Sequence, residues 1–471
     1  MKLPLARIEE FVQGTGEFDG HLVAGGYSID SRTITPGQVF FAVAGERVDG
    51  HEFVEAALQA GAVAAVVRKD MLARYSVKTG LIAVDDTLAA LQALAAAVRR
   101  LWGKTVVGVT GSTGKTTTKD AIAHVLSSRL NVLKSVGNLN NHFGLPLQLL
   151  RLEREHETAV IEMGMSHAGE ILALAGLAQP DIGVVTNVAP VHLEFFDSLA
   201  SIARAKYELI ASLPPGGTAI LNADDEYVSQ FGRDFTGKVV TYGIRKPADV
   251  RAENVEPRGL LGSSFDVVAN GRRARASVAL VGEHNVLNSL AATAVALERG
   301  LPLETAVESL STLAASEKRG EILKLGGATI INDCYNSNPK ALKSMIDALV
   351  SVPAGRHVVV AGEMLELGPA GESLHHECGR FMALKGVKRL IGVRGLAEAM
   401  VRAAAAEGVD AVFVATPEEA GERIAAELRE GDVVLMKASR GVRLERALEI
   451  LKARKDASAD AAPVSAVDPG R

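Results

Sequence analysis

The stretch at residues 105–118, TVVGVTGSTGKTTT, constrains the fold more than any other part of this chain. A short β-branched strand runs into a glycine-rich loop that ends in Gly114-Lys115-Thr116, where a helix is expected to begin. Such a loop turns backbone N–H groups toward a phosphate, while the lysine reaches the outer phosphates and the threonine hydroxyl can ligate Mg²⁺. The stretch therefore predicts an ATP site. The residues expected to bind ATP there are Gly111, Ser112, Thr113, Gly114, Lys115, Thr116 and Thr117.

The loop departs from the general phosphate-loop pattern at one position. That pattern begins with glycine, whereas this chain has Val109 at the corresponding place, so the shorter form from Gly111 to Thr117 carries the match. The alternative is a glycine turn between a strand and a helix with an incidental lysine. We favour nucleotide binding because a strand and a helix flank the loop on the sides that the motif requires.

Length and composition bound the class of protein. A chain of 471 residues is too long for a single hydrophobic core, and ordinary domain sizes suggest about three domains. Hydrophobic residues make up 48% and charged residues 23%, which is typical of a globular protein and excludes a largely disordered one. The net charge of −5 excludes a generally basic protein, so no nucleic acid is expected as a partner.

Two features favour a cytoplasmic protein. Cys334 and Cys378 are too few for a disulfide framework and lack metal-site spacing, so they are interpreted as free thiols of a reducing compartment. Glutamates interrupt the N-terminal stretch where a signal peptide needs an apolar core, and charges or glycines break the longest apolar runs. No membrane insertion is therefore expected.

The pattern of strands and helices predicts an α/β fold in three domains. Residues 1–102 alternate short apolar strands with helical runs and end in a helix predicted over 87–101. Residues 103–315 carry continuous apolar runs near 160, 184 and 220, which suit a parallel sheet buried on both faces. Because ligands bind at the carboxyl ends of strands in such sheets, the polar residues that follow these runs are expected near the phosphates. These residues are Glu162, Thr186, Asn187 and Asn222.

The C-terminal part repeats the alternation. Residues 316–454 contain a further series of strands and helices, which predicts a smaller Rossmann-like domain. Before it, residues 264–280 alternate around Asn270-Gly271, a two-residue hairpin signal, and predict an antiparallel edge on the central sheet. Residues 455–471 lack periodicity and are expected to be a disordered tail.

Motifs on both sides of the phosphate loop carry a family resemblance. The first are Asp30-Ser31-Arg32 and Gly45 in the first domain, and Asn138, Asn140 and Asn141 after the loop. With the loop they resemble the ATP-dependent Mur ligase family over about residues 28–445. The resemblance implies that the first domain grips a UDP-sugar substrate through the earlier group and that the asparagines line the reaction centre. Taken alone, Asp-Ser-Arg is more often a surface turn, and asparagine clusters are usually turns and caps.

The same resemblance implies two Mg²⁺ sites. Glu162 matches the family's magnesium-binding glutamate, His192 its histidine ligand, and Thr116 the phosphate-loop ligand. Since Mg²⁺ prefers oxygen ligands, the histidine rests on the resemblance alone. Lys206 falls where these ligases carry a carbamylated lysine, a modification that needs the neutral amine and converts a cation into an anion. The alternatives are that His192 is a structural histidine and that Lys206 is an exposed lysine on a helix. Lys115, Lys206, His192 and Glu162 are thus the expected catalytic residues.

The remaining motifs lie at the predicted junction with the third domain. By resemblance, His284 and Asn285 clasp adenine, Arg319 contacts the phosphates, and Asp333 lies near the ribose. A helix start of this composition could also be a simple cap. The segment Tyr335-Asn336-Ser337-Asn338-Pro339 has the form found in members that add D-alanyl-D-alanine to UDP-N-acetylmuramoyl-tripeptide, so Tyr335, Asn336 and Asn338 are expected to bind substrate. The chain departs from the family pattern at Glu363, Ala341 and Ala438.

The resemblance implies an ATP-dependent amide ligase that works through an acyl phosphate. Its partners would be the two small-molecule substrates, and it would act as a monomer. Two other functions are weighed: a family member that adds a single amino acid or glutamate units to folate, and a regulatory module in which ATP turnover changes conformation. The Tyr-Asn-x-Asn-Pro segment argues against the first, and the UDP-sugar element argues against the second. Whether the third residue of the peptide is lysine or diaminopimelate is not legible from the sequence.

Overall fold

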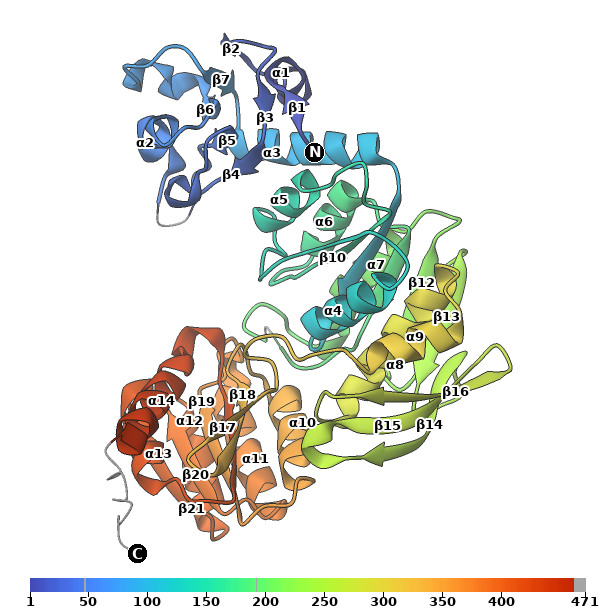
Figure 1. Ribbon diagram of the computed structural model, residues 1–471, viewed down its shortest axis with the longest axis vertical. Helices are drawn as coiled ribbons and strands as arrows, with labels where there is room; N and C mark the ends of the chain where they lie inside the picture. The colour runs from blue at the N-terminus through green and yellow to red at the C-terminus, as the bar shows by residue number, and fades with distance from the viewer. Residues whose placement is uncertain (46–47, 192, 461–471) are drawn as a thin grey trace, which may run out of the picture.

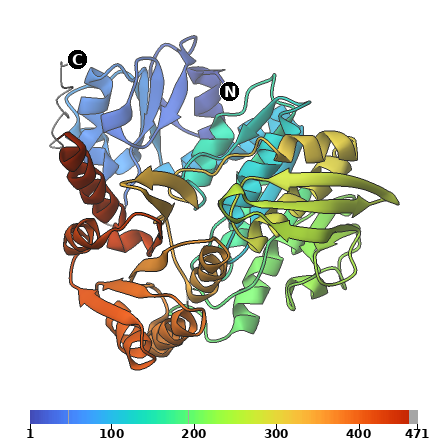
Figure 2. The same cartoon turned by 60° about the horizontal axis from the view of Figure 1, so that its bottom comes forward.

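Three α/β units, each with one main sheet, make up the described part of the chain, and a two-stranded sheet adds to the N-terminal unit. The structure is a computed structural model, and it describes residues 1–45, 48–191 and 193–460, with side chains to residue 454. Figure 1 shows the N-terminal unit in blue at the top, the central unit in cyan to yellow below it, and the C-terminal unit in orange and red at the bottom. In the turned view of Figure 2 the three units lie around a common centre.

The N-terminal unit has a five-stranded sheet in the order β2-β7-β6-β5-β4. Strands β4 to β7 pair in parallel, and only β2 runs antiparallel at the edge. Helix α3 closes the unit: the Asp86 carboxylate accepts hydrogen bonds from the first N–H groups of the helix, and Gly103 ends it with a φ of 66°. The elements are β1 (Leu3–Pro4), α1 (Leu5–Val12), β2 (Thr15–Glu17), β3 (Val23–Ala24), β4 (Gly26–Ser28), η1 (Ser31–Thr33), β5 (Gln38–Phe41), η2 (Gly50–Phe53), α2 (Val54–Gln59), β6 (Ala64–Arg68), η3 (Lys69–Arg74), β7 (Leu81–Val84) and α3 (Thr87–Trp102).

The central unit has a nine-stranded sheet in the order β16-β15-β14-β13-β12-β11-β8-β10-β9. Strands β8 to β14 pair in parallel, and buried residues on both faces of the sheet contact helices. The elements are β8 (Thr105–Thr110), α4 (Lys115–Leu126), β9 (Val132–Lys134), α5 (Gly144–Leu150), β10 (Thr158–Glu162), α6 (Glu170–Ala178), β11 (Ile182–Val185), α7 (Leu199–Ala211), β12 (Thr218–Asn222), η4 (Val228–Gln230), β13 (Lys238–Gly243), β14 (Val250–Pro257), η5 (Gly259–Leu261), β15 (Ser263–Ala269), β16 (Arg272–Val278), α8 (Glu283–Glu298) and α9 (Leu303–Leu310).

The C-terminal unit has a six-stranded sheet in the order β17-β18-β22-β19-β20-β21. All neighbours pair in parallel except β17 and β18, and helices cover both faces, as in a doubly wound fold. The elements are β17 (Glu321–Leu325), β18 (Ala328–Asp333), α10 (Pro339–Val350), β19 (Arg356–Gly362), η6 (Gly368–Ala370), α11 (Gly371–Leu384), β20 (Arg389–Val393), α12 (Ala397–Ala406), β21 (Asp410–Val414), α13 (Pro417–Glu427), β22 (Asp432–Lys437), η7 (Arg440–Val442) and α14 (Glu445–Asp460).

The predicted α/β class, parallel sheets and hairpin are confirmed. Strands β15 and β16 pair antiparallel around Asn270-Gly271, and both residues have positive φ values of 51° and 72°. The boundaries at 102/103 and 315/316 stay predictions. The tail prediction is wrong in part, because α14 continues to Asp460, past the predicted start at residue 455; alanine and lysine favour helix there despite the missing apolar period. Residues 461–471 lie outside the described part of the chain.

Across the described residues, each helix is too short or too polar to span a bilayer.

Candidate active site

The phosphate loop follows β8, which lies between β11 and β10, third from one edge of the central sheet. Gly111 has a φ of 148°, and a Cβ built on it would overlap the hydroxyl of Thr186. Gly114 has a φ of 79° and immediately precedes α4. Both positions therefore require glycine, one for close approach and both for backbone conformation. The result is a tight loop that leads directly into the start of α4, where helix N–H groups can bind a phosphate.

Lys115 is the first residue of α4 and is partly buried in the cavity wall. Its Nζ donates to the carbonyl of Gly111 at 2.7 Å, so the ammonium folds back over the loop. Burial lowers the pKa of Lys115 below its ordinary value; the nearby carboxylate of Glu162 opposes this shift, and the charge of Arg319 adds to it. The negative charge of an incoming phosphate would therefore stabilise the Lys115 ammonium in this position.

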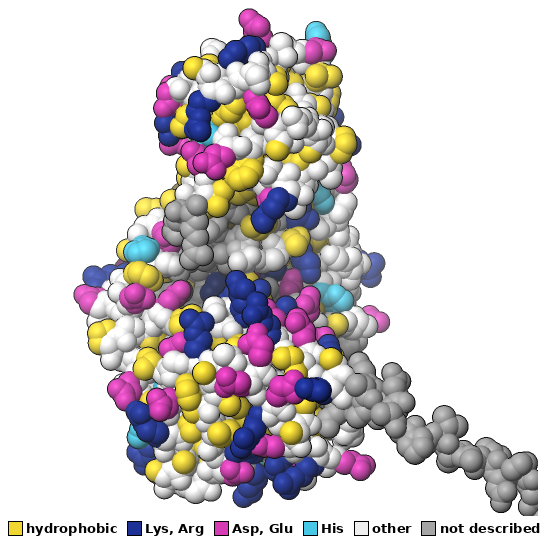
Figure 3. Space-filling view, turned by 90° about the vertical axis from the view of Figure 1, so that its left-hand side faces the viewer, with side chains coloured by type: hydrophobic (Ala, Val, Ile, Leu, Met, Phe, Trp, Pro, Cys, Tyr) yellow, Lys and Arg dark blue, Asp and Glu magenta, His cyan; other side chains and the backbone are white. Residues whose placement is uncertain are grey.

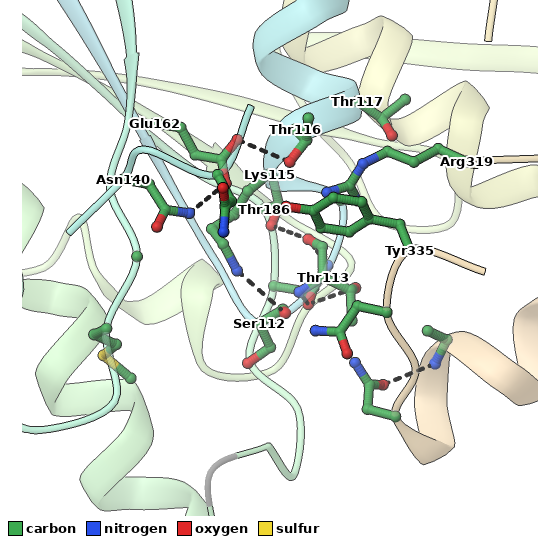
Figure 4. Close-up of a pocket in the computed structure, with 18 of the residues that line it drawn as sticks. Ser112, Thr113, Lys115, Thr116, Thr117, Asn140, Glu162, Thr186, Arg319 and Tyr335 are labelled. Atoms are coloured by element: carbon green, nitrogen blue, oxygen red, sulfur yellow. Dashed lines mark hydrogen bonds between the residues drawn. The ribbon is translucent and has the colours of Figure 1, made fainter. Parts of the chain in front are cut away.

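Glu162 ends β10 and faces the loop (Figure 4). Its Oε2 accepts a hydrogen bond from Thr116 Oγ1 at 2.8 Å, and its Oε1 accepts one from Asn140 Nδ2 at 2.8 Å. A carboxylate and a hydroxyl are ligands that Mg²⁺ prefers, so this pair fits that ion. No group of three His, Cys, Asp or Glu side chains within the described ranges is arranged to hold a metal. His192, the other expected ligand, lies outside the described residues.

The ends of the neighbouring strands hold the loop in place. Thr186 Oγ1 donates to the carbonyl of Thr113 at 2.6 Å, and the Asn187 amide oxygen accepts from Thr113 N at 3.1 Å. Asn222, at the end of β12, donates to the carbonyl of Thr186 at 2.8 Å. The polar residues that follow the apolar runs therefore gather at one edge of the sheet, as their positions predicted.

Lys206 lies on α7 with only 2% of its surface exposed. Burial and then the positive charge of Lys115 lower the pKa of Lys206 well below its ordinary value. The shift is toward the neutral amine, which is the form that carbamylation needs. The exposed helix lysine weighed from the sequence is not what the fold contains.

The start of α8 and the segment after β18 form the opposite side of the site. His284 lines the cavity, and burial lowers its pKa to about 4, so its imidazole is neutral at physiological pH. The Arg319 guanidinium lies 3.9 Å from the centre of the Tyr335 ring (Figure 4). Lys437 Nζ contacts Asp333 Oδ2 at 2.5 Å, which holds that carboxylate at the end of β18.

One cavity of about 1140 Å³ joins these parts across the central and C-terminal units. In Figure 3 the surface is hollowed between the upper and lower parts of the molecule, with Lys and Arg side chains beside the hollow. Gly111 and Lys206 are not part of the lining; Gly111 accepts a hydrogen bond from Lys115, whose charge also acts on Lys206. The predicted site residues that line the cavity are Ser112, Thr113, Gly114, Lys115, Thr116, Thr117, Asn138, Asn140, Asn141, Glu162, His284, Asn285, Arg319, Asp333, Tyr335, Asn336 and Asn338.

The expected UDP-sugar residues lie apart from this cavity, in the N-terminal unit. Arg32 pairs with Asp30 through two hydrogen bonds of 2.9 and 2.7 Å, and Arg32 N donates to the same carboxylate at 3.0 Å. These hydrogen bonds lower the pKa of Asp30, and those from the Arg32 side chain have the largest effect. Ser31 and Gly45 are close to the surface as well. The local geometry is a surface turn, so the structure does not bring Asp30, Ser31, Arg32 or Gly45 into contact with the phosphate loop.

Lys119 and Asp120 were not predicted from the sequence as part of this site. Lys119 Nζ lies 3.9 Å from Glu162 Oε2 and 3.5 Å from Asp120 Oδ1, and its side chain is 3% exposed. The spacing of Lys119 from Thr116 could have predicted it. Lys119 follows Thr116 by three positions, so both lie on the same face of α4.

The fold and the site together define a nucleotide-binding enzyme whose phosphate loop faces a second, Rossmann-like unit. Three family models match the chain in order: "Mur ligase family, catalytic domain" at residues 24–99, "Mur ligase middle domain" at 109–296, and "Mur ligase, glutamate ligase domain" at 318–440. The chain belongs to the Mur ligase family and is an ATP-dependent ligase.

Similar proteins narrow the position within the family. The chain is 37% identical over 460 residues to the UDP-N-acetylmuramoyl-tripeptide–D-alanyl-D-alanine ligase of Bacillus subtilis, covering 96% of this chain and 98% of that protein. The ligase of the same name from Escherichia coli is 34% identical over 389 residues, covering 80% of this chain and 83% of that protein.

Solved structures agree with this position. A crystal structure of MurF from Acinetobacter baumannii superimposes with a TM-score of 0.87 at 28% identity, covering 96% of this chain and 99% of that chain. MurF ligase from Thermotoga maritima in complex with ADP superimposes with a TM-score of 0.80 at 28% identity, covering 92% and 98%. The three-unit α/β fold is thus the Mur ligase fold.

Proposed function

We propose that this chain joins D-alanyl-D-alanine to UDP-N-acetylmuramoyl-tripeptide with ATP, through an acyl phosphate on the peptide carboxylate. One observation carries the proposal: a single cavity brings Lys115 and Glu162 of the central unit opposite Tyr335 and Asn336 of the C-terminal unit. The relatives that carry the D-alanyl-D-alanine ligase name match the chain over nearly its full length, which supports this substrate over the other ligations of the family.

The phosphate loop would hold the triphosphate. The loop leads directly into the start of α4, where the first N–H groups of a helix can bind a phosphate, and Lys115 would leave the Gly111 carbonyl to contact the outer phosphates. Arg319 lies across the cavity and would add positive charge on the far side of the transferring phosphoryl group. Phosphoryl transfer depends mainly on positioning and on charge, so these groups lower the barrier without covalent chemistry.

Mg²⁺ fits the Thr116 and Glu162 oxygens, and when bound it would offset the charge on the phosphates and on the attacking carboxylate. Asn140 orients Glu162 through its amide N–H. A second Mg²⁺ is proposed at His192 and Lys206, with Lys206 as its carbamate. The support for the carbamate is the burial of Lys206 and its lowered pKa, because carbon dioxide reacts with the neutral amine.

The nucleotide base would lie near α8. His284 is neutral at physiological pH and lines the cavity, so its ring can stack on adenine without placing a charge there. Asp333, held by Lys437, would face the ribose. Asn285 donates to the carbonyl of Val281 at 2.9 Å, which fixes its amide beside the cavity.

The residues proposed to bind the two substrates come from different units. Asp30, Ser31, Arg32 and Gly45 are proposed to bind the UDP end, and Asn138, Asn140 and Asn141 to line the path of the peptide. Tyr335, Asn336 and Asn338 are proposed to bind D-alanyl-D-alanine. Because the first group lies outside the cavity, the units must approach one another when substrate binds, and this closure would exclude water from the acyl phosphate.

An acceptor assay tests the function. Purified protein with ATP, Mg²⁺ and UDP-N-acetylmuramoyl-tripeptide should release phosphate only when D-alanyl-D-alanine is added, with an equal amount of the pentapeptide product by mass spectrometry. Single D-alanine or L-amino acids serve as matched acceptors and should give no product. Parallel assays with the lysine and diaminopimelate tripeptides identify the third residue. Phosphate release without regard to the acceptor would contradict the proposal and favour the regulatory-module alternative.

The carbamate has its own test. Protein equilibrated with ¹³C-bicarbonate should show one carbamate carbon resonance that disappears in Lys206→Met. An unmodified amine in bicarbonate would contradict the proposal, because the free lysine could not ligate a metal as an anion.

Three further features are proposed with this function. The chain acts as a monomer in the cytoplasm, and its domains divide at 102/103 and 315/316. The supports are a cavity lined by two units of the same chain and two free, buried cysteines among the described residues. Sedimentation at assay concentrations tests the monomer, since a dimer would sediment faster.

A further inference from the structure

Lys119 is shared between two carboxylates of different function. Its ammonium lies 3.9 Å from Glu162 Oε2, the proposed metal ligand, and 3.5 Å from Asp120 Oδ1. The Lys119 side chain is 3% exposed, so it interacts with both partners in a medium that screens charge weakly. A cation this close to Glu162 competes with any divalent ion for the same oxygen.

Asp120 is in turn held by two residues. Its Oδ1 accepts from Lys134 Nζ at 2.9 Å, and its Oδ2 accepts from Ser316 Oγ at 2.6 Å. Burial favours the neutral acid, but Lys119, Ser316 and Lys134 outweigh it and lower the pKa of Asp120, so this carboxylate is charged. A charged Asp120 is the counter-ion that draws Lys119 away from Glu162.

Ser316 connects this cluster to the C-terminal unit. It lies between α9 and β17, the segment that joins the two units, and its carbonyl accepts a hydrogen bond from Arg319 N at 3.1 Å. The turn that it begins therefore carries Arg319, which lines the cavity over Tyr335. The connecting segment thus contacts both Asp120 and the proposed phosphate-binding arginine.

We propose that Asp120 is a positioning residue: it holds the Lys119 ammonium off Glu162 so that this carboxylate is free for Mg²⁺, and Ser316 links that state to the segment between the units. The inference rests on the proposed function, because it assigns Glu162 to Mg²⁺. It adds a regulated element to the site, since movement of the connecting segment would change how strongly Asp120 attracts Lys119.

The variants make opposite predictions for metal binding. In Asp120→Asn, Lys119 has only Glu162 as a carboxylate partner, so divalent-ion affinity should fall about tenfold. Lys119→Met in that background removes the competitor and should restore affinity to within about threefold of wild type. Ser316→Ala should weaken binding about twofold to threefold, because Asp120 keeps its other partners.

Mn²⁺ binding in the presence of ADP, followed by the electron paramagnetic resonance of free Mn²⁺, measures this without turnover. Lys246→Met is the matched control: it also replaces a lysine by methionine, but at an exposed position outside the cavity lining, so affinity should not change. Melting curves check that each variant folds. If Asp120→Asn does not fold, Lys119→Met alone carries the test and should bind Mn²⁺ at least as tightly as wild type.

The outcomes separate this inference from the proposed function. Unchanged affinity in Asp120→Asn, or no recovery in the double variant, overturns the inference. Weaker binding in Lys119→Met alone also overturns it, because Lys119 would then assist the metal. If wild-type protein binds Mn²⁺ with ADP but makes no amide with D-alanyl-D-alanine, the proposed function fails while the metal-binding result still decides the role of Asp120.

Discussion

Two regions expected to bind phosphorylated ligands, the loop at Gly111 to Thr117 and the turn at Asp30 to Arg32, are held in opposite ways. The loop is held by residues distant in the chain, with Thr186 and Asn187 bonded to Thr113. The turn is held by itself, because Arg32 pairs with Asp30 two positions away and is 86% exposed. The loop is therefore preorganised for its ligand, whereas the turn must give up an internal ion pair when it binds one.

The largest effect that this contrast predicts is at Lys115. Lys115→Met should lower kcat about 10³-fold, because the positive charge that the loop supplies to the transferring phosphate is lost. Steady-state release of phosphate at saturating ATP measures this. Lys246→Met removes a lysine at an exposed position and should leave kcat unchanged. A Lys115→Met enzyme within about tenfold of wild type would show that the loop amides alone hold the phosphates.

At the turn the effect should be smaller and confined to binding. Arg32→Ala should raise the KM for the UDP-linked substrate about tenfold and leave kcat and the KM for ATP unchanged, because the residue lies outside the cavity. Initial rates over a range of each substrate separate these constants. Arg7→Ala, an exposed arginine on α1, is the control. A fall in kcat would mean that Arg32 also acts during closure.

His284, on the nucleotide side of the cavity, should also make the stability of the protein depend on pH. The folded pKa of His284 is about 4, below its value of 6.5 in the unfolded chain, so on acidification the unfolded chain takes up this proton first. Stability is unaffected above pH 6.5 and falls as the pH drops toward 4. Because His284 keeps partial contact with solvent in the cavity, we expect a loss of about 1 kcal/mol by about pH 5.

Urea unfolding of wild type and His284→Gln at pH 7 and pH 5 isolates this contribution. The glutamine variant should lose less stability on acidification, since it has no proton to take up. Equal losses in the two proteins would mean that His284 titrates as it does in the unfolded chain.

The smallest expected effect is the change in the free energy of unfolding caused by a substitution at the turn. Arg32→Ala should change the free energy of unfolding by less than about 0.5 kcal/mol, because exposed ion pairs contribute little. Urea unfolding at neutral pH measures it. A larger loss would show that the turn is held more firmly than its exposure indicates, and the contrast with the phosphate loop would weaken.

Much of the fold was predictable because local patterns and tertiary demands agree. The apolar runs at β10, β11 and β12 are buried on both faces, and the Asn270-Gly271 pair forms the hairpin that its backbone preferences favour. The gathering of Glu162, Thr186 and Asn222 followed from the rule for strand ends. The helix past residue 455 was missed because propensity formed it without an apolar period.

By itself the sequence determined the phosphate loop, the α/β class and the family, because these depend on residue types at fixed local spacing. Only the tertiary structure decided which loop residues are held from a distance, that Lys206 is buried with a lowered pKa, and that Lys119 lies between Glu162 and Asp120. Ser316 follows Asp120 by nearly two hundred positions, yet they share a hydrogen bond of 2.6 Å. The physical reason is that burial and charge pairing depend on what packs nearby in space, which the order of residues along the chain does not state.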